Sequence, residues 1–165
     1  MRTFAGEFMG SEEIKNNVKK ILTDYLEEKK LRKTAERFAI LDEVYSINGH
    51  FDIEALYLHM KAKKYQVSRA TLYNTVEVLL DCKLITRHQF GKNQAMYEKA
   101  YMYRQHDHLI CEDCEHVFEF CDPRLQQIQQ MAGSLLKFEV SKHALTLYGK
   151  CQSLHKTGKC VHGHK

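Results

Sequence analysis

Residues 68–99 read SRATLYNTVEVLLDCKLITRHQFGKNQAMYEK, a helical pattern that changes directly into two strand patterns. Ser68 can cap a helix, and the apolar face of that helix carries Leu72, Val76, Leu79 and Leu80. The two strand patterns, 84–90 and 94–99, flank Gly91-Lys92-Asn93, which is rich in turn-forming residues. A helix followed by a hairpin predicts the recognition helix and wing of a winged helix-turn-helix domain.

Three further helical patterns precede this stretch. Ser11, Thr34 and Asp52 can each cap a helix, and each is followed by apolar residues at helical spacing. Four short helices before the first strand pattern are in keeping with a winged helix. We therefore predict that residues 1–100 form a winged-helix DNA-binding domain, of which residues 1–10 are loose.

Basic and hydrogen-bonding residues gather around the predicted recognition helix. No acidic residue lies between Glu54 and Glu77, whereas three lysines do. A solvated basic surface is the plain alternative, but a basic cluster in front of a capped helix favours DNA binding, with the helix in the major groove and the wing on the flanking backbone or minor groove. The side chains predicted to contact DNA are Arg32, Lys33, Arg37, Lys61, Lys63, Lys64, Ser68, Arg69, Thr71, Tyr73, Asn74 and Lys92.

The composition is that of an ordinary globular protein. The 165 residues are 44% hydrophobic and 28% charged, and no apolar run approaches the roughly 18 residues that a transmembrane helix requires. The N-terminus lacks the apolar block of a secretory signal. We therefore expect a cytoplasmic chain with one or two small domains and no membrane association. Its cysteines are then expected to be metal ligands or redox thiols rather than a disulfide framework.

Residues 101–165 form the second predicted domain, whose tail after residue 160 is expected to be loose. Strand-like runs at 108–111 and 116–120 surround a turn. Asp122 and Pro123 then open a helix, and the apolar stripe of this helix, which we expect to join the core, comprises Leu125, Ile128, Met131 and Leu135. Phe138, Val140, Leu145 and Leu147 indicate one or two further strands.

A small α/β unit of this kind has open strand edges, which favours pairing with a second copy. The fold class predicted from the sequence is therefore α+β. It combines an N-terminal winged helix-turn-helix domain with a small C-terminal α/β dimerisation domain, and the expected partners are double-stranded DNA and a second copy of the chain.

Metal-ligand side chains are concentrated in the second domain. Five of the six cysteines and seven of the ten histidines lie there. Cys111 and Cys114 stand on a tight turn, where two thiolates form half of a tetrahedral zinc site. Cys151 and Cys160 can supply the other half, and the alternatives to Cys160 are His155, His162 and His164. The competing interpretation is two pairs of buried or redox-active thiols.

A second set of candidate ligands precedes the first cysteine pair. Residues i and i+2 of a strand share a face, so His106 and His108 are expected to point together and Asp107 away from them. Glu119 lies on the following run, and His50 and Glu98 of the first domain can complete a shell, although each alone is more often a solvated surface group. Imidazoles with carboxylates suit iron, manganese, zinc or nickel.

The run His106–Cys114, HDHLICEDC, resembles the signature of the ferric uptake regulator family. Segments 31–41, 70–73, 84–90 and 145–151 resemble family segments in the same order, so that the likeness covers about residues 30–160. The resemblance implies a dimeric, metal-dependent transcriptional regulator with a structural zinc bound by four cysteines. It implies a regulatory metal site that consists of His50, Glu98, His106, His108 and Glu119.

The resemblance also implies a second metal site in the dimerisation domain, at positions 105, 107, 126 and 143. Only Asp107 and His143 are ligand types there, because Gln105 and Gln126 replace the usual His and Glu. Any such site is therefore expected to be weak. The spacing of Cys151 and Cys160 is also longer than usual.

The function predicted from these residues is that of a metal-responsive transcriptional repressor, not an enzyme. Structural Zn(II) and regulatory Fe(II) are the expected cofactors, Mn(II) and Zn(II) are possible substitutes for iron, and the target is a palindromic operator of iron-uptake genes. Asn74 resembles peroxide-sensing members, which implies the alternative that peroxide oxidises His50 or His106 in a reaction catalysed by bound Fe(II). Glu98 and Glu119, where those members usually carry Asp, favour iron sensing. Less favoured alternatives are a zinc or manganese sensor, a metallohydrolase, for which the sequence shows no general base or nucleophile motif, and a purely structural zinc module.

Overall fold

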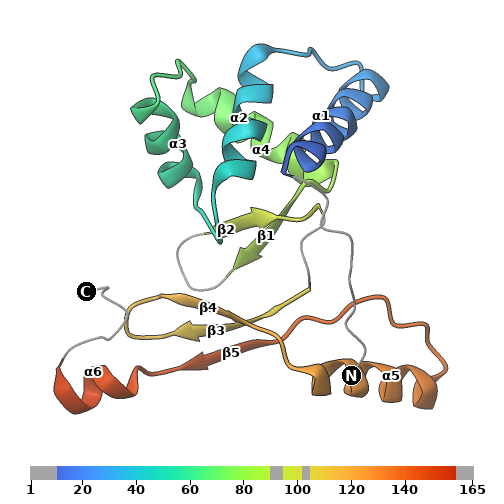
Figure 1. Ribbon diagram of the computed structural model, residues 1–165, viewed down its shortest axis with the longest axis vertical. Coiled ribbons are helices and arrows are strands. Elements are labelled where there is room, and N and C mark those ends of the chain that lie inside the picture. Colours follow the sequence, from blue (N-terminus) through green and yellow to red (C-terminus); the bar gives the residue numbers. More distant parts are fainter. Residues whose placement is uncertain (1–10, 90–94, 102–104, 159–165) are drawn as a thin grey trace. The chain divides into compact units, whose positions relative to one another are not determined.

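The computed structural model describes residues 11–89, 95–101 and 105–158. The chain divides into two compact units, Met1–Tyr103 and Arg104–Lys165, which are called the N-terminal and C-terminal units (Figure 1). The predicted α+β class is confirmed, since each unit combines helices with a small sheet. No helix in the described part of the chain has both the length and the apolar character needed to cross a membrane.

The N-terminal unit consists of helices followed by a hairpin. In chain order, its elements are α1 (Ser11–Glu28), α2 (Ala35–Ser46), α3 (Ile53–Ala62), α4 (Arg69–Asp81), β1 (Ile85–Gln89) and β2 (Ala95–Lys99). The predicted caps at Asp52 and Ser68 are confirmed, because their side chains accept hydrogen bonds from the N–H groups of Ala55 at 2.7 Å and Thr71 at 3.0 Å. The antiparallel hairpin β1–β2 is the predicted wing.

The apolar faces of the four helices form the core of this unit. Fully buried side chains include Leu22, Leu26, Ile40, Leu41, Leu56, Leu72 and Leu79. Burial of each such side chain contributes about 1.5–3 kcal/mol. Phe51 forms an isolated β-bridge with Tyr97 of β2, with N···O distances of 2.9 and 2.8 Å. This bridge fixes the segment before α3 against the wing.

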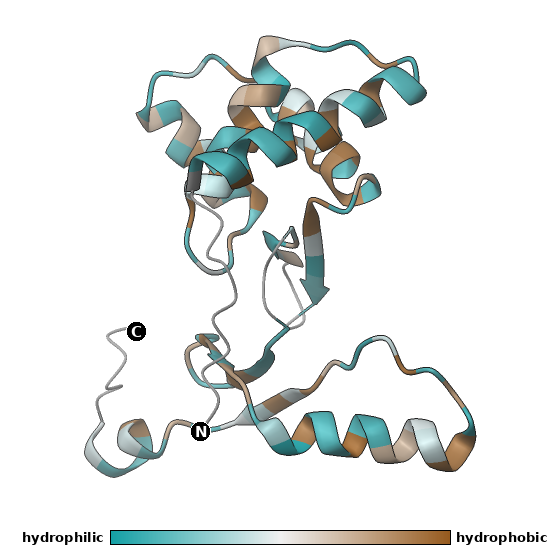
Figure 2. Ribbon diagram, turned by 45° about the vertical axis from the view of Figure 1, so that its right-hand side comes forward, coloured by the Kyte–Doolittle hydropathy of each residue, from teal (hydrophilic) through white to brown (hydrophobic). Residues whose placement is uncertain are grey.

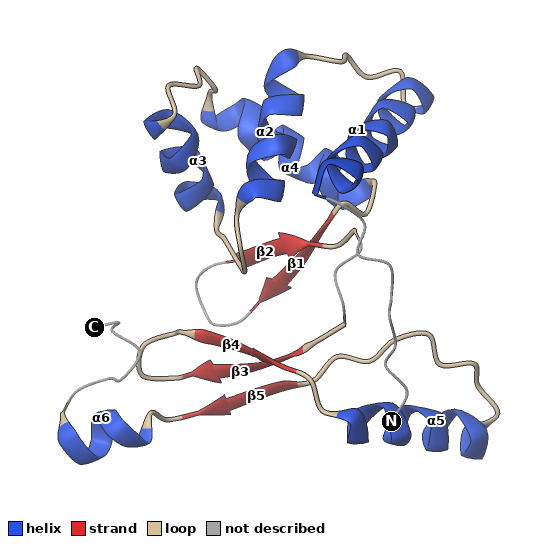
Figure 3. Ribbon diagram, in the orientation of Figure 1, coloured by secondary structure: helices blue, strands red, loops and turns tan. Residues whose placement is uncertain are grey.

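The C-terminal unit is built on a three-stranded sheet (Figure 3). Its elements are β3 (Asp107–Cys111), β4 (Val117–Phe120), α5 (Pro123–Leu136), β5 (Thr146–Gly149) and α6 (Gln152–Thr157). The strand order is β4-β3-β5, in which β3 pairs antiparallel with β4 and parallel with β5. A parallel pair needs a crossover connection, which α5 and the residues after it supply.

Two details of this unit differ from the prediction. Residues 138–145 form an irregular connection rather than a strand, and only Thr146–Gly149 of the last apolar region is a strand among the described residues. The apolar stripe of α5, expected in the core, is exposed on the single chain. Ile128 is 54%, Met131 65% and Leu135 78% exposed, and Figure 2 shows hydrophobic positions along this helix. Other residues of the helix contact the connection that follows it. The Gly133 carbonyl accepts the Phe138 N–H at 2.9 Å, and Gln129 donates to the Val140 carbonyl at 2.9 Å.

Candidate metal centres and nucleic-acid interface

Three metal-type donors meet on the wing of the N-terminal unit. The donor atoms of His50, His88 and Glu98 all lie within 4.8 Å of one another. One Glu98 oxygen, Oε2, is 3.2 Å from His50 Nε2, and the other, Oε1, is 2.6 Å from His88 Nε2. The Phe51–Tyr97 bridge brings His50 to this place, because it pairs the residue after His50 with the residue before Glu98. These three residues form the N-terminal donor set.

The prediction from the sequence did not include His88. In the hairpin register, His88 faces Met96 and Thr86 faces Glu98. His88 and Glu98 are therefore diagonal neighbours on one face of the wing, within reach of long side chains. The sequence alone does not give the register of the hairpin, because the exact ends of its turn are not evident from the residues. The proximity of His88 to Glu98 could therefore not be predicted.

A second group of donors lies on the sheet of the C-terminal unit. The rings of His106 and His108 meet edge to face with centroids 4.8 Å apart. His108 is directly opposite Glu119 in the β3–β4 register, and the Glu119 Oε1 atom is 3.9 Å from His106 Nε2. These three residues form the C-terminal donor set. Each donor set combines imidazole and carboxylate ligands, a chemistry that fits borderline divalent ions such as iron, manganese and zinc.

The cysteine turn is tied to the start of α6 by Asp113. Its Oδ2 atom accepts a hydrogen bond from the Cys151 N–H at 2.7 Å and lies 4.0 Å from Cys111 Sγ. Its carboxylate oxygens are each 3.2 Å from His155 Nε2. The Cys151 N–H, followed by His155, holds the pKa of Asp113 below its usual value. The carboxylate thus joins the Cys111–Cys114 turn to Cys151, while Cys160, His162 and His164 lie outside the described residues.

The remaining described cysteines have other surroundings. Burial raises the pKa of the Cys82 thiol to about 11, so this cysteine is a neutral packing residue at physiological pH. The exposed Cys121 donates from Sγ to the Gln105 carbonyl at 3.6 Å. Neither belongs to the two donor sets or to the cysteine turn.

The residues predicted to bind DNA fall into two groups. Lys61, Lys64, Tyr73 and Asn74 are exposed, and Tyr73 is 52% exposed. Other side chains of the predicted set bind the protein itself. Lys63 forms an ion pair with Glu43 at 2.5 Å and Lys33 pairs with Glu27, while the Arg37 guanidinium donates to the Arg32 carbonyl at 2.9 Å. Lys92 lies outside the described residues.

Arg69 at the start of α4 turns back onto α3. Its Nη2 and Nε atoms donate to the two oxygens of Glu54 at 2.6 and 3.2 Å. Its guanidinium carbon lies 4.2 Å from the centre of the Tyr57 ring, a cation–π contact. The side chain therefore links α4 to α3.

Comparison with known proteins identifies this arrangement. Residues 28–148 match the model of the ferric uptake regulator family. The chain belongs to that family. It is 30% identical to the peroxide operon regulator of Bacillus subtilis over 131 residues, which cover 79% of this chain and 89% of the relative. It is 33% identical to the ferric uptake regulation protein of Haemophilus influenzae over 107 residues, which cover 65% and 73% of the two chains.

A solved structure agrees with the family assignment. The ferric uptake regulator of Pseudomonas aeruginosa, determined with manganese, superposes with a TM-score of 0.69 at 27% identity, and the match covers 79% of this chain and 97% of the other. Members of the ferric uptake regulator family are transcription regulators, not enzymes, and depend on metal ions. The predictions of a metal-dependent transcription regulator and of no enzymatic activity are confirmed at this level.

Proposed function

We propose that this ferric uptake regulator is a homodimeric repressor that binds a palindromic operator when one Fe(II) ion is held by His50, Glu98, His106, His108 and Glu119. The observation that supports this proposal is the distribution of the donors. The N-terminal and C-terminal donor sets each hold three ligand-type side chains, on two units whose described parts are separated by residues 102–104. An ion bound by both sets would restrict the angle between the two units.

The regulatory effect depends on a difference in affinity between two arrangements of the units. A metal ion shifts their balance only if it binds one arrangement more tightly. To move the DNA-competent fraction from about 1% to about 99%, the difference must be about 10⁴-fold. Ligands from a single donor set would bind both arrangements equally, so the contribution of both sets is essential to the proposal.

The proposed structural zinc is bound by Cys111, Cys114, Cys151 and Cys160, with His155, His162 or His164 as the alternative to Cys160. The contacts of Asp113 with the cysteine turn and with the start of α6 support this assignment. Zinc bound there would hold α6 against the end of β3. Its role is therefore to stabilise the C-terminal unit rather than to sense a metal.

The proposed DNA-reading element is α4, which enters the major groove. Ser68, Thr71, Tyr73 and Asn74 present hydrogen-bonding groups near its N-terminus, and Lys61 and Lys64 are exposed next to it. Base edges are recognised by such polar side chains, and phosphates by the lysines. A two-fold dimer would read two half-sites about one helical turn apart. A repressor of this kind would act in the cytoplasm, where it reaches its operator.

The proposed dimer interface lies on the C-terminal unit. The exposed stripe Ile128, Met131 and Leu135 of α5 is apolar, and β4 and β5 are the edges of the three-stranded sheet. Exposed apolar faces and open strand edges are covered in stable proteins by a partner. A second copy of the chain satisfies both requirements, in agreement with family members that act as dimers.

The experiment that tests the proposal is anaerobic operator binding titrated with Fe(II), Mn(II) and Zn(II), with metal content measured in parallel. His106→Ala should abolish the metal-dependent part of operator binding and retain the structural zinc. His116→Ala is the matched control, because its ring meets the Phe118 ring edge to face, with centroids 4.5 Å apart, and belongs to neither donor set. Unchanged metal dependence in His106→Ala would refute the proposal. If Mn(II) or Zn(II) stimulates operator binding at a lower concentration than Fe(II) does, the protein is instead a manganese or zinc sensor.

A peroxide sensor is the second candidate function. Asn74 and the 30% identity to a relative named peroxide operon regulator favour it. In such a sensor, Fe(II) and peroxide would add an oxygen atom to the ring of His50 or His106. Mass spectrometry of both peptides after dilute peroxide distinguishes the two functions, because an iron sensor keeps both rings unmodified and retains operator binding.

A further inference from the structure

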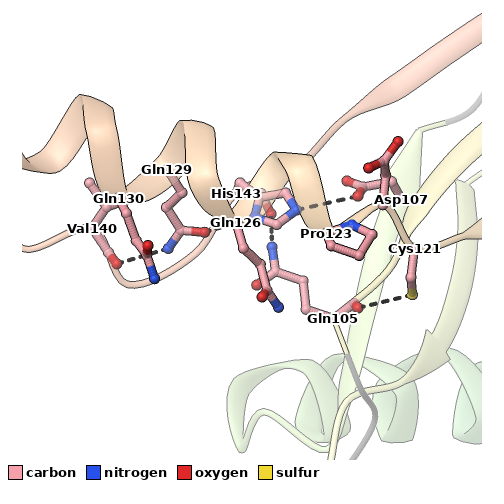
Figure 4. A pocket seen from close by; sticks show the side chains of 10 residues that line it. Gln105, Asp107, Cys121, Pro123, Gln126, Gln129, Gln130, Val140 and His143 are labelled. Carbon is pink, nitrogen blue, oxygen red and sulfur yellow. Dashed lines mark hydrogen bonds and ion pairs between the residues drawn. The ribbon is translucent and has the colours of Figure 1, made fainter. Parts of the chain in front are cut away.

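The side of β3 opposite the C-terminal donor set carries Asp107, which is 2% exposed. Asp107 borders a surface pocket of about 490 Å³, which is also lined by Gln105, Gln126, Gln129 and His143 (Figure 4). Four of these residues, Gln105, Asp107, Gln126 and His143, stand at the positions at which the family resemblance implies a second metal site. The question is whether the side chains present here fit a metal ion.

Hydrogen bonds engage both ring nitrogens of His143. Its Nε2 atom lies 3.3 Å from Asp107 Oδ2, and its Nδ1 atom lies 2.8 Å from Gln129 Oε1. The orientation of the Gln129 amide is settled by its other end, because Nε2 donates to the Val140 carbonyl at 2.9 Å. The atom of Gln129 that faces His143 is therefore an acceptor, like the carboxylate on the opposite side of the ring.

The Gln129 oxygen therefore accepts from Nδ1 of the His143 ring, while Nε2 of the same ring faces the Asp107 carboxylate. The ring thus bridges the two side chains. The other oxygen of Asp107 is also engaged, since it accepts the Leu145 N–H at 2.9 Å. The two ligand-type residues of the implied site are thus used by hydrogen bonds within the protein.

The other two positions do not supply a ligand set either. Gln105 donates from its amide nitrogen to the His143 carbonyl at 2.6 Å, and Gln126 is an exposed neutral amide. Neutral amides are poor replacements for the imidazole and carboxylate that iron, manganese or zinc favour. The residues in the pocket therefore do not fit a tightly bound divalent ion.

We propose that this pocket is a metal-free clasp, in which the His143 ring bridges Asp107 of β3 and Gln129 of α5. The clasp ties together three segments: the central strand, the helix with the exposed apolar stripe, and the irregular connection 138–145. It also holds β3 from behind, on the side opposite His106 and His108. Asp107, Gln129 and His143 are thus positioning residues, and the inference does not depend on which metal the donor sets bind.

The first test locates metal ions in crystals of the full chain grown with Mn(II), by anomalous scattering. The clasp predicts no manganese within bonding distance of His143 and Asp107 in the natural sequence. The double variant Gln105→His, Gln126→Glu supplies the missing ligands and is expected to gain one ion per chain in this pocket. Manganese bound to His143 in the natural sequence would overturn the proposal. The proposal would also fail if the double variant lost the His143 bridge and still bound no manganese in this pocket.

The second test measures thermal unfolding with and without added Mn(II), while the zinc content is monitored. His143→Ala removes the bridge and is expected to lower Tm by roughly 4 °C or more, yet the rise in Tm on adding Mn(II) should equal that of the natural sequence. The double variant Gln105→His, Gln126→Glu should show a larger rise. If the Mn(II)-dependent rise of the natural sequence is lost in His143→Ala, the pocket binds metal and the clasp is wrong. If His143→Ala does not fold, the Mn(II)-dependent rise in Tm is compared between the natural sequence and the double variant, and an equal rise in the two would contradict the clasp.

Discussion

The carboxylate of Glu98 on β2 lies 2.6 Å from Nε2 of His88 on β1. The same carboxylate contacts His50 through its other oxygen at 3.2 Å. His88 therefore either joins the proposed regulatory shell or orients the Glu98 carboxylate within it. In both roles, the wing of the N-terminal unit would take part in the proposed metal sensing.

His88→Ala tests this role of the wing. Loss of a ligand or of a partner that orients one typically lowers metal affinity about 10–100-fold, so the Fe(II) or Mn(II) concentration for half-maximal operator binding should rise by that factor. Competition with a metal chelator of known affinity measures the change directly. His59→Ala is the control, since His59 contacts Glu43 at 2.9 Å and lies on α3, outside both donor sets. Equal metal affinity in His88→Ala and the natural sequence would limit His88 to a packing role.

Arg69 and Lys64 are expected to contribute differently to DNA binding. Lys64 is exposed, so Lys64→Ala should weaken binding to all sequences and reduce the slope of log affinity against log salt by about 1. The guanidinium of Arg69 is paired with Glu54 and stacked on Tyr57, so Arg69→Ala should change this slope less. Glu54→Gln should reproduce part of the affinity loss of Arg69→Ala, because it removes the same link between α3 and α4. Binding measured by fluorescence anisotropy at several salt concentrations separates these effects, and a full unit of slope lost in Arg69→Ala would show a direct phosphate contact.

The environment of Glu43 leads us to expect that the free energy of unfolding depends on pH. Burial acts to raise the pKa of this carboxyl, but hydrogen bonds from Lys63, Ser46 and His59 lower it below the ordinary value of 4.5. A carboxyl whose pKa is lower in the folded state stabilises the fold above its unfolded pKa, and this stability is lost as the pH falls through the folded pKa. The free energy of unfolding should therefore decline with acidification below about pH 4.5. Urea titrations across this range should show a weaker decline in Glu43→Gln, and an identical decline would contradict the assignment.

Removal of the proposed structural zinc should unfold the C-terminal unit. Cys111→Ser or a strong chelator should abolish the bound zinc and the cooperative unfolding of this unit, because binding energy at a structural site is folding energy. Cys121→Ser is the matched control, since this thiol is exposed and donates to the Gln105 carbonyl rather than joining the cysteine turn. Zinc content and circular dichroism measure both effects. A C-terminal unit that stays folded without zinc would favour the interpretation as redox thiols.

The local pattern of the sequence predicted the helices of the N-terminal unit well, because their caps and apolar spacing lie within single segments. Asp52 and Ser68 cap as expected. The alternation of strand residues also predicted that His106 and His108 share a face. Long-range relationships were harder to predict. His88 requires the exact register of the wing, and the contacts of His143 with Gln129 and Asp107 join segments that are distant in the sequence.

The stripe of α5 shows a different limit of sequence patterns. Its apolar spacing indicates a buried face but does not say whether the same chain or a second chain buries it. In the single chain Leu135 is 78% exposed. The prediction for Arg69 meets the same limit. The sequence shows a basic residue at the start of a helix, but it does not show that Glu54 and the Tyr57 ring contact its guanidinium.

The location of the regulatory ion tests the central claim most directly. Crystals of the full chain prepared anaerobically with Mn(II) as the probe for the regulatory metal can be examined by anomalous diffraction at the manganese edge. We expect one manganese ion bonded both to His50 or Glu98 and to His106, His108 or Glu119. Manganese bonded to the residues of one donor set alone, or two ions with one on each set, would contradict it.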